Sequence, residues 1–198
     1  LSRNFLTAYL HWKGMTDEDA IVMSESAARR FSAPHPLEVG DKLSNRHGTK
    51  GVVGAVLPDD QMPHLPDGRA VDLIFDSIAM HTRLNFGQVL EGLFGLIAEK
   101  RGEPVVASPF QRTSPEKLHA ALREAGLPES GQFTLRDGTG GRELDEPTTV
   151  GIVYWGKTVH LAKEKIHALG ADHFVGEGGR PPFLGQAAGE MEYRALWA

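Results

Sequence analysis

The sequence predicts a mixed α/β fold that is mainly β. Glycine occurs 23 times and proline 12 times in 198 residues, and together they divide the chain into short apolar segments. Short segments between turn-forming residues are typical of strands joined by tight turns, and not of a helical bundle. Hydrophobic residues make up 40% of the chain, which is enough for the core of one or two small domains.

Five segments are predicted to form strands because they are short, apolar and rich in β-branched or aromatic residues. A buried helix stays the alternative for each of them, since an apolar run of this length fits both structures. The five segments are 5–12, 20–23, 52–57, 71–75 and 148–154.

Two helices are predicted from their caps and spacing. Ser114 is a good N-cap, Pro115 stands in the first turn, and apolar residues follow at helical spacing until Gly126 ends the pattern. A second helix is expected over about 85–100. Three glycines weaken its helical pattern, and we expect them to mark close packing against a neighbour.

A third helix is expected over roughly 157–169, where His160, Glu164 and His167 would lie along one side. Histidine ligands of zinc on one helix usually stand four residues apart, so a pair seven apart is a weak match to a metal site. The lysines of the same segment indicate either a face that lines a nucleic-acid groove or a solvated charged face.

The charge of the chain excludes one way of binding nucleic acid. A net charge of −5 and a pI near 6.0 do not suit a protein that neutralises phosphates by its overall positive charge. Any contact must therefore be local. The strongest candidates are Lys42, Arg46, His47 and Lys50, which lie within ten residues, 41–50, that hold one acid, Asp41.

The chain has no cysteine, which excludes a disulfide framework and a thiolate zinc site and fits a reducing compartment. No segment approaches the roughly 18 apolar residues that a membrane helix needs. The first residues show no basic segment followed by an apolar run. We therefore expect a cytoplasmic protein with no membrane partner.

The segment 39–53 is rich in glycine and cations and leads into an apolar strand. Glycines let a backbone approach a ligand closely, and Lys42 and Lys50 are point charges that can hold the phosphates of a chain end or a triphosphate. The segment lacks the spacing of a Walker motif, so an ordinary solvated basic turn is the alternative.

The order of several motifs is similar to one protein family. Gly-Asp-Lys, Arg-His-Gly and Lys-Gly-Val follow one another within 40–52. Further similar segments are 18–25, 83–91, 127–132 and 189–192. Over nearly its whole length the chain thus resembles the catalytic-barrel region of the beta (second-largest) subunit of multisubunit RNA polymerase, as a reduced relative without flap or lobes.

The resemblance implies a double-psi β-barrel with added helices and hairpins. Most of the barrel and its following helix would occupy 1–105, and a helical and hairpin insertion would occupy 106–146. The returning barrel strand and a hybrid-binding-like C-terminal part would follow in 147–198.

The resemblance also implies roles for individual residues. Lys42 and Lys50 would reach the RNA end or the incoming nucleotide, and Arg83 would contact nucleotide phosphates as the third catalytic cation. Glu18 and Asp19 would lie near the second magnesium. Contacts to nucleic acid are expected from Arg46, His47, Gln88, Lys157, His160, Lys165 and His167.

A complete magnesium site is not expected in this chain. It has no motif of three aspartates alternating around glycine, and its closest acid-rich segments are 17–19 and 59–60. In extended geometry Glu18 would point away from its two neighbours, so a solvated turn is the preferred interpretation of 17–19. We expect Mg²⁺ to be held mainly by a beta-prime-like partner, with no cofactor bound tightly by this chain.

These expectations combine into one function and one alternative. The chain would contribute cations to a nucleotidyltransferase centre, act on nucleotides or an RNA–DNA hybrid, and be inactive alone. Its departures from the family favour the alternative, a non-catalytic nucleic-acid-binding or scaffold paralogue. Only about a dozen residues around 34–36 replace the flap, and segments 167–169 and 185–188 lack arginines that the family has.

Overall fold

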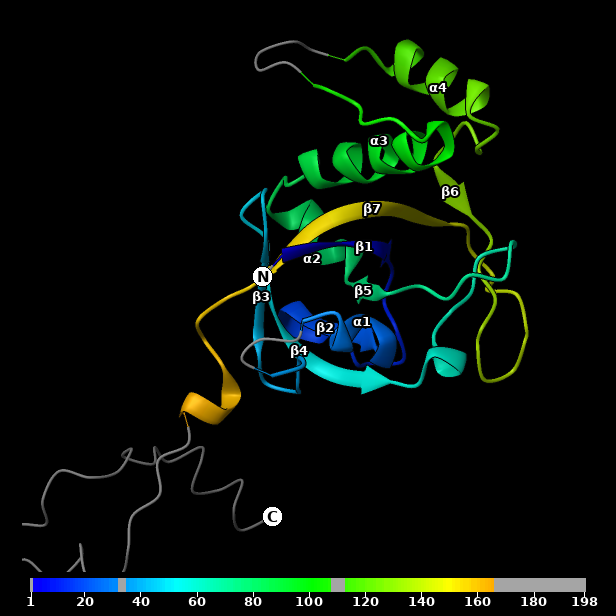
Figure 1. Ribbon diagram of the computed structural model, residues 1–198. Coiled ribbons are helices and arrows are strands. Elements are labelled where there is room, and N and C mark those ends of the chain that lie inside the picture. The colour runs from blue at the N-terminus through cyan, green and yellow to red at the C-terminus, as the bar shows by residue number, and fades with distance from the viewer. Residues whose placement is uncertain (1, 32–34, 108–112, 166–198) are drawn as a thin grey trace, which may run out of the picture. The chain divides into compact units, whose positions relative to one another are not determined.

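The computed structural model describes residues 2–31, 35–107 and 113–165 (Figure 1). The chain divides into two compact units, Leu1–Ala162 and Lys163–Ala198. The first unit contains every strand described below, and the description concerns this unit unless stated otherwise.

Six strands of the first unit close into a barrel. The strand order is β1-β5-β2-β4-β3-β7-β6, and the additional pairing of β1 with β7 closes the ring and leaves β6 outside it. The pairs β1–β5 and β2–β4 are parallel, whereas the other pairs are antiparallel. The strands are β1 (Ser2–Tyr9), β2 (Ala20–Ser24), β3 (Lys42–Asn45), β4 (Lys50–Leu57), β5 (Leu73–Phe75), β6 (Gln132–Phe133) and β7 (Thr148–Lys157).

Alternate side chains of all six strands fill the interior of the barrel. Burying these aliphatic and aromatic groups removes apolar surface from water, which is the main driving force for closing the sheet. The Trp155 indole N–H donates to Thr7 Oγ1 at 3.3 Å, so its polar atom is satisfied inside the core. The interior residues are Phe5, Tyr9, Ile21, Met23, Leu43, Val53, Leu73, Phe75, Val153 and Trp155.

The described part of the chain has four α-helices besides the barrel strands. Helix α4 begins as predicted, since the Ser114 hydroxyl accepts a hydrogen bond from Lys117 N at 3.3 Å and Pro115 follows in the first turn. Helix α3 also matches its predicted range to within a few residues. The helices are α1 (Glu25–Arg29), α2 (Ser77–Thr82), α3 (Gly87–Arg101) and α4 (Pro115–Glu124).

The glycines of α3 let this helix approach β7 closely, as Figure 1 shows. A Cβ atom on Gly92 would lie 3.0 Å from the Cα atom of Gly151, and one on Gly95 would lie 2.5 Å from the carbonyl oxygen of Ile152. Any side chain at these positions would push the helix away from the strand. The expectation that glycines in this helix mark close packing is confirmed.

These results confirm the mainly β, mixed α/β class and the expected barrel. All five predicted strands occur, although β1 starts earlier than predicted and ends at Tyr9. The strand β3 was predicted only as part of a loop. It is short, and turn-forming residues flank it on both sides, so the sequence around it has the character of a turn.

The prediction of a helix over 157–169 is wrong for its first residues. β7 continues to Lys157, residues 158–161 are not helical, and a 3-10 segment follows at Ala162–Lys165. Pairing overrides the helical spacing here, because Gly156 lies opposite Ser2 of β1 and Lys157 lies opposite Leu43 of β3. Residues 166–169 lie outside the described residues.

None of the helices in the described part of the chain has the length and apolar character that crossing a lipid bilayer requires.

Candidate phosphate site

The two predicted catalytic lysines stand on the same open face of the β3–β4 hairpin. Lys42 pairs with Val52, and Ser44 pairs with Lys50. Paired residues of an antiparallel sheet share a face, and the four residues alternate with buried neighbours along both strands. Lys50 is exposed, Lys42 is partly exposed, and Val52 between them is 43% exposed. The hairpin therefore directs two positive charges toward one side.

Arg83 lies beside this face and forms an ion pair with Asp19. Arg83 follows the last turn of α2, and its guanidinium donates to both carboxylate oxygens, with Nη2 to Oδ2 at 2.7 Å. The hydrogen bonds and charge of Asp19 raise the pKa of Arg83 further above its ordinary value. Asp19 immediately precedes Ala20, which pairs with Val52 in the hairpin. The predicted catalytic cations thus share one region.

The acids of segment 17–19 do not form one site. Glu18 and Asp19 adopt left-handed backbone conformations, with φ values of 49° and 68°. Asp17 lies 3.4 Å from His11 Nδ1, whereas both oxygens of Asp19 face Arg83. Mg²⁺ binds through one or two carboxylates together with waters and substrate phosphates. Glu18 and Asp19 fit such a partial contribution, with further ligands coming from elsewhere, and this role stays a prediction.

A different set of residues has the geometry of a metal-ligating group. Ligand atoms of His11, Asp17 and Asp76 all lie within 4.8 Å of one another. Asp76 also caps α2, because its Oδ1 accepts from Ile78 N at 2.9 Å. This cluster could not be predicted from local patterns, since Asp76 is 59 residues away from Asp17 in the sequence. A contact between the histidine and the two carboxylates is the alternative interpretation, because His11 Nδ1 lies 3.4 Å from Asp17 Oδ1 and 4.0 Å from Asp76 Oδ2.

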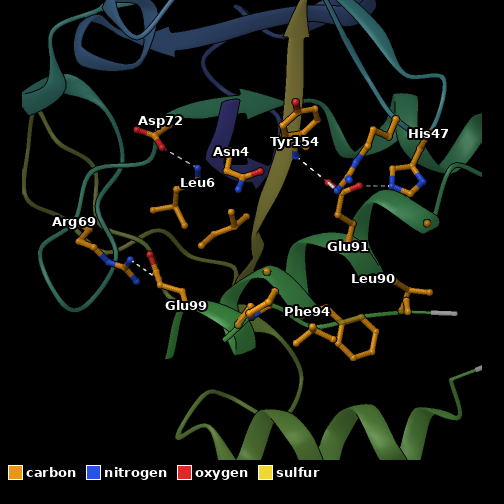
Figure 2. Close-up of a pocket in the computed structure, with 18 of the residues that line it drawn as sticks. Asn4, Leu6, His47, Arg69, Asp72, Leu90, Glu91, Phe94, Glu99 and Tyr154 are labelled. Carbon is orange, nitrogen blue, oxygen red and sulfur yellow. Dashed lines mark hydrogen bonds and ion pairs between the residues drawn. The ribbon is translucent and has the colours of Figure 1, made fainter. Parts of the chain in front are cut away.

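Arg46 and His47 meet on one carboxylate. Figure 2 shows Glu91 of α3 between His47 and the backbone N–H of Tyr154. Glu91 Oε1 accepts from Arg46 Nη2 at 2.7 Å and from Tyr154 N at 2.9 Å, and Oε2 lies 2.5 Å from His47 Nε2. Burial favours the protonated carboxyl, but Arg46, Tyr154 N–H and His47 outweigh it and lower the pKa of Glu91.

Gln88 holds the same turn from the inside of the molecule. It is fully buried, accepts from Asn45 Nδ2 at 2.7 Å and donates to Thr49 Oγ1 at 3.1 Å. Asn45 Oδ1 accepts the backbone N–H groups of His47 and Thr49 at 2.9 and 3.1 Å. Gln88 was predicted to contact nucleic acid, and its described contacts are with the β3–β4 turn and Tyr9.

Lys157 lies in a buried ion pair with Asp41. The side chains are 3% and 0% exposed, and Lys157 Nζ lies 3.4 Å from Asp41 Oδ2 and 2.8 Å from the carbonyl oxygen of His35. Burial raises the pKa of Asp41, but the N–H groups of Ala162 and Glu38 and the Lys157 ammonium more than offset it, so the pKa is lowered. Lys157 was predicted to contact nucleic acid, and its described contacts are structural.

The remaining predicted contacts are not assembled by the described residues. His160 is exposed, and its carbonyl oxygen accepts from Lys42 N at 3.1 Å. Lys165 ends the 3-10 segment and belongs to the second compact unit. His167 lies outside the described residues. Their contacts with nucleic acid stay predictions.

Comparison with known proteins identifies the family. Residues 30–172 match the family model described as RNA polymerase Rpb2, domain 6. The chain belongs to the RNA polymerase beta-subunit family. This membership confirms the resemblance inferred from the motifs, and the closed barrel agrees with the double-psi fold that the resemblance implied.

Curated relatives of this beta-subunit domain are much longer than it is. A DNA-directed RNA polymerase subunit beta from Chloroflexus aggregans is 44% identical over 167 residues, which are 82% of this chain and 14% of the relative. Those from Leuconostoc mesenteroides and Salinibacter ruber are each 40% identical, over 82% and 95% of this chain. The chain spans about 14 to 15% of the length of these three relatives.

The partners of the turn in this beta-subunit domain were missed by reasoning from the sequence. Glu91 lies within a motif that pointed to the family, but it is 44 and 45 residues away from His47 and Arg46. Local patterns do not reveal contacts over such separations. The one available signal was that segment 42–50 is rich in basic residues although the chain carries a net charge of −5. Such a segment is expected to find acidic partners elsewhere in the chain.

Proposed function

We propose that this beta-subunit domain supplies phosphate- and nucleotide-binding cations to a nucleotidyltransferase centre that a beta-prime-like barrel completes. The observation that carries the proposal is the shared open face of Lys42 and Lys50, with Arg83 beside it. The ligands would be nucleotides or an RNA–DNA hybrid. A cytoplasmic location follows from that role.

The chemistry of nucleotidyl transfer explains why three cations suit this face. The 3′ hydroxyl of a nucleic-acid chain attacks the α-phosphorus of a nucleoside triphosphate, a new P–O bond forms, and pyrophosphate leaves with the electrons of the broken P–O bond. Negative charge grows on the leaving group, and fixed cations stabilise it. Lys42 and Lys50 would hold the chain end or the triphosphate as point charges.

Arg83 would exchange one anion for another when a ligand binds. Its side chain is 48% exposed in the pair with Asp19, and exposed ion pairs contribute only about 0–1 kcal/mol. A triphosphate carries several negative charges and can compete for the guanidinium. Displacement would also free the Asp19 carboxylate near the phosphates.

Magnesium would be shared unequally with the partner. When bound, the ion supplies charge stabilisation and orients the phosphates. In this chain Glu18 and Asp19 would contribute to the second ion, and the partner would bring the main carboxylate cluster. The chain is accordingly proposed to be inactive alone.

Primer extension tests the proposal. The full chain is mixed with a beta-prime-like barrel protein, a template, a primer and nucleotides. We expect extension by the pair, loss of extension in Lys42→Ala/Lys50→Ala, and no change in Lys117→Ala, whose lysine is exposed on α4. An inert wild-type pair would contradict the proposal.

A second candidate is a non-catalytic nucleic-acid-binding or scaffold role. It is favoured by the internal pairing of predicted contact residues, since Glu91 engages Arg46 and His47 and Asp41 pairs with Lys157. Salt-dependent binding of an RNA–DNA hybrid without nucleotide incorporation would support the binding role. A scaffold role predicts that alanine at Lys42 and Lys50 leaves both hybrid binding and partner binding unchanged.

A further inference from the structure

One carboxylate of helix α3 holds an arginine and a histidine of the turn between β3 and β4. We call Arg46, His47 and Glu91 the Glu91 clamp. Glu91 lines a groove of about 1520 Å³ together with Leu90 and Phe94 of the same helix, and Figure 2 labels all three residues. The Glu91 side chain is only 14% exposed, so its charge is partly removed from water and needs these partners.

Both carboxylate oxygens of Glu91 are engaged. Arg46 and His47 are each fixed in place by a second contact. The Arg46 guanidinium also lies over the Tyr154 ring, 4.9 Å from its centroid. The His47 ring packs against the start of α3, where a Cβ atom on Gly87 would lie 2.7 Å from His47 Nδ1. Glycine at 87 therefore leaves the space that the imidazole occupies. Glu91 thus occupies His47 Nε2 and Arg46 Nη2, while the Arg46 side chain stays 62% exposed.

The turn that the clamp holds joins the two strands that bear the lysines. Ser44 and Lys50 are paired across the hairpin, and Arg46 and His47 lie between them in the sequence. Gly48 completes the turn with a φ of 81°. Gln88 bonds the side chain of Asn45, whose Oδ1 in turn accepts backbone N–H groups of the turn, and the clamp fixes the outer side of the same turn to α3. The direction of the hairpin face therefore depends on both sets of contacts.

We propose that Glu91 is a positioning residue that orients Lys42 and Lys50 through Arg46 and His47. In this arrangement Arg46 and His47 hold the turn and are not phosphate ligands. The inference rests on the proposed function, because it concerns how the same hairpin face is aimed at phosphate.

The two roles for Arg46 and His47 predict opposite effects of Glu91→Gln. If they are phosphate ligands, removing the carboxylate charge frees the Arg46 guanidinium and the His47 imidazole and strengthens hybrid binding. If they hold the turn, the same substitution loosens the hairpin and weakens binding. We expect weakening of about tenfold, which corresponds to about 1.4 kcal/mol. Glu99→Gln is the matched control, since Glu99 lies on the same helix and pairs with Arg69 at 2.8 Å.

The dissociation constant of the full chain for a short RNA–DNA hybrid is measured at several salt concentrations. The slope of the logarithm of the binding constant against the logarithm of the salt concentration distinguishes the two explanations. A change in positioning alters this slope, whereas a mere loss of folding stability leaves it unchanged. A freed Arg46 would steepen the slope by roughly one counterion, whereas a loosened hairpin makes it shallower. In an Arg46→Gln/His47→Gln background, Glu91→Gln should have little further effect.

Hydrogen exchange of the turn amides in the free protein gives an independent readout. We expect faster exchange at residues 46–48 in Glu91→Gln and unchanged exchange in Glu99→Gln. Wild-type binding with equal or tighter binding by Glu91→Gln would overturn the inference and leave the proposed function intact. If the wild type binds no hybrid, the proposed function fails and the inference fails with it, even where the exchange data show a clamp.

Discussion

Single charged residues in this barrel differ sharply in what surrounds them. Asp41 is fully buried against Lys157, whereas Lys50 stands exposed a few residues further along the chain. A buried carboxylate beside a buried ammonium is tolerated because each satisfies the other, and removing one leaves an uncompensated charge. Burial therefore identifies Lys157 as a structural cation, whereas the exposed Lys50 stays available to a ligand.

Asp41→Asn should destabilise the protein strongly. The substitution leaves the Lys157 ammonium buried without its carboxylate, and breaking a buried pair in this way costs about 3–5 kcal/mol. Urea denaturation measures the loss. Glu124→Gln is the control, because its pair with Arg101 is exposed and should be worth less than about 1 kcal/mol.

The pH dependence of the same variant provides a second check. The pKa of Asp41 is lowered in the folded state, so the unfolded chain takes up this proton at a higher pH than the folded chain does. The stability from Asp41 is full above about pH 4, the ordinary value, and is lost as pH falls through the lowered pKa. The difference between wild type and Asp41→Asn should shrink only below about pH 4, and a difference that stays constant there would contradict the assignment.

At the scale of elements, local sequence patterns predicted the strands and helices whose signals are local, but not the parts of the fold that depend on distant pairing. The strands with strong apolar patterns and the capped helix α4 could be predicted because their signals lie within a few neighbouring residues. The end of β7 could not, since Lys157 is held in a strand by partners 114 and more residues away in the sequence, such as Leu43. The same limit hid the partners of Arg46 and His47, although both residues were recognised as site candidates.

Gly95→Ala tests the contact between α3 and β7. Alanine favours helix over glycine by about 1 kcal/mol, but the new Cβ atom would lie 2.5 Å from the Ile152 carbonyl oxygen. Overpacking of this kind costs typically about 1–3 kcal/mol, so we expect a net loss of stability and a lower Tm. Gly140→Ala is the control, because a Cβ atom there meets nothing within 4 Å. Equal stability of Gly95→Ala and wild type would show that the helix can move away from the strand.

At the scale of the whole molecule, the candidate site adds little to the stability of the barrel. Lys42 and Lys50 lie on the outer face of a hairpin whose inner face contributes Leu43 and Val53 to the core. The fold can therefore tolerate changes at the site that remove function. This separation is compatible with both of the proposed roles, the catalytic one and the binding one.

Lys42→Ala/Lys50→Ala should keep its stability. Neither lysine forms a described ion pair, and substitutions at exposed positions usually change the free energy of unfolding by less than about 0.5 kcal/mol. Urea denaturation and hybrid binding should be measured on the same sample. Loss of binding with unchanged unfolding is the expected result, whereas joint loss of both would mean that the lysines support the fold.

The pairing of β1 with β7 also determines at which stage of folding the face that bears Lys42 and Lys50 is completed. Ser2 lies opposite Gly156, so the ring closes only when the two ends of the first unit meet. Contacts between residues so distant in sequence form slowly, because the entropy of closing the intervening loop is lost before the pairing compensates for it. The β3–β4 hairpin can form early from local contacts, but α3 and β7, which hold its turn and its base, come later. During synthesis on a ribosome, the lysines would therefore acquire their final orientation only after β7 has emerged.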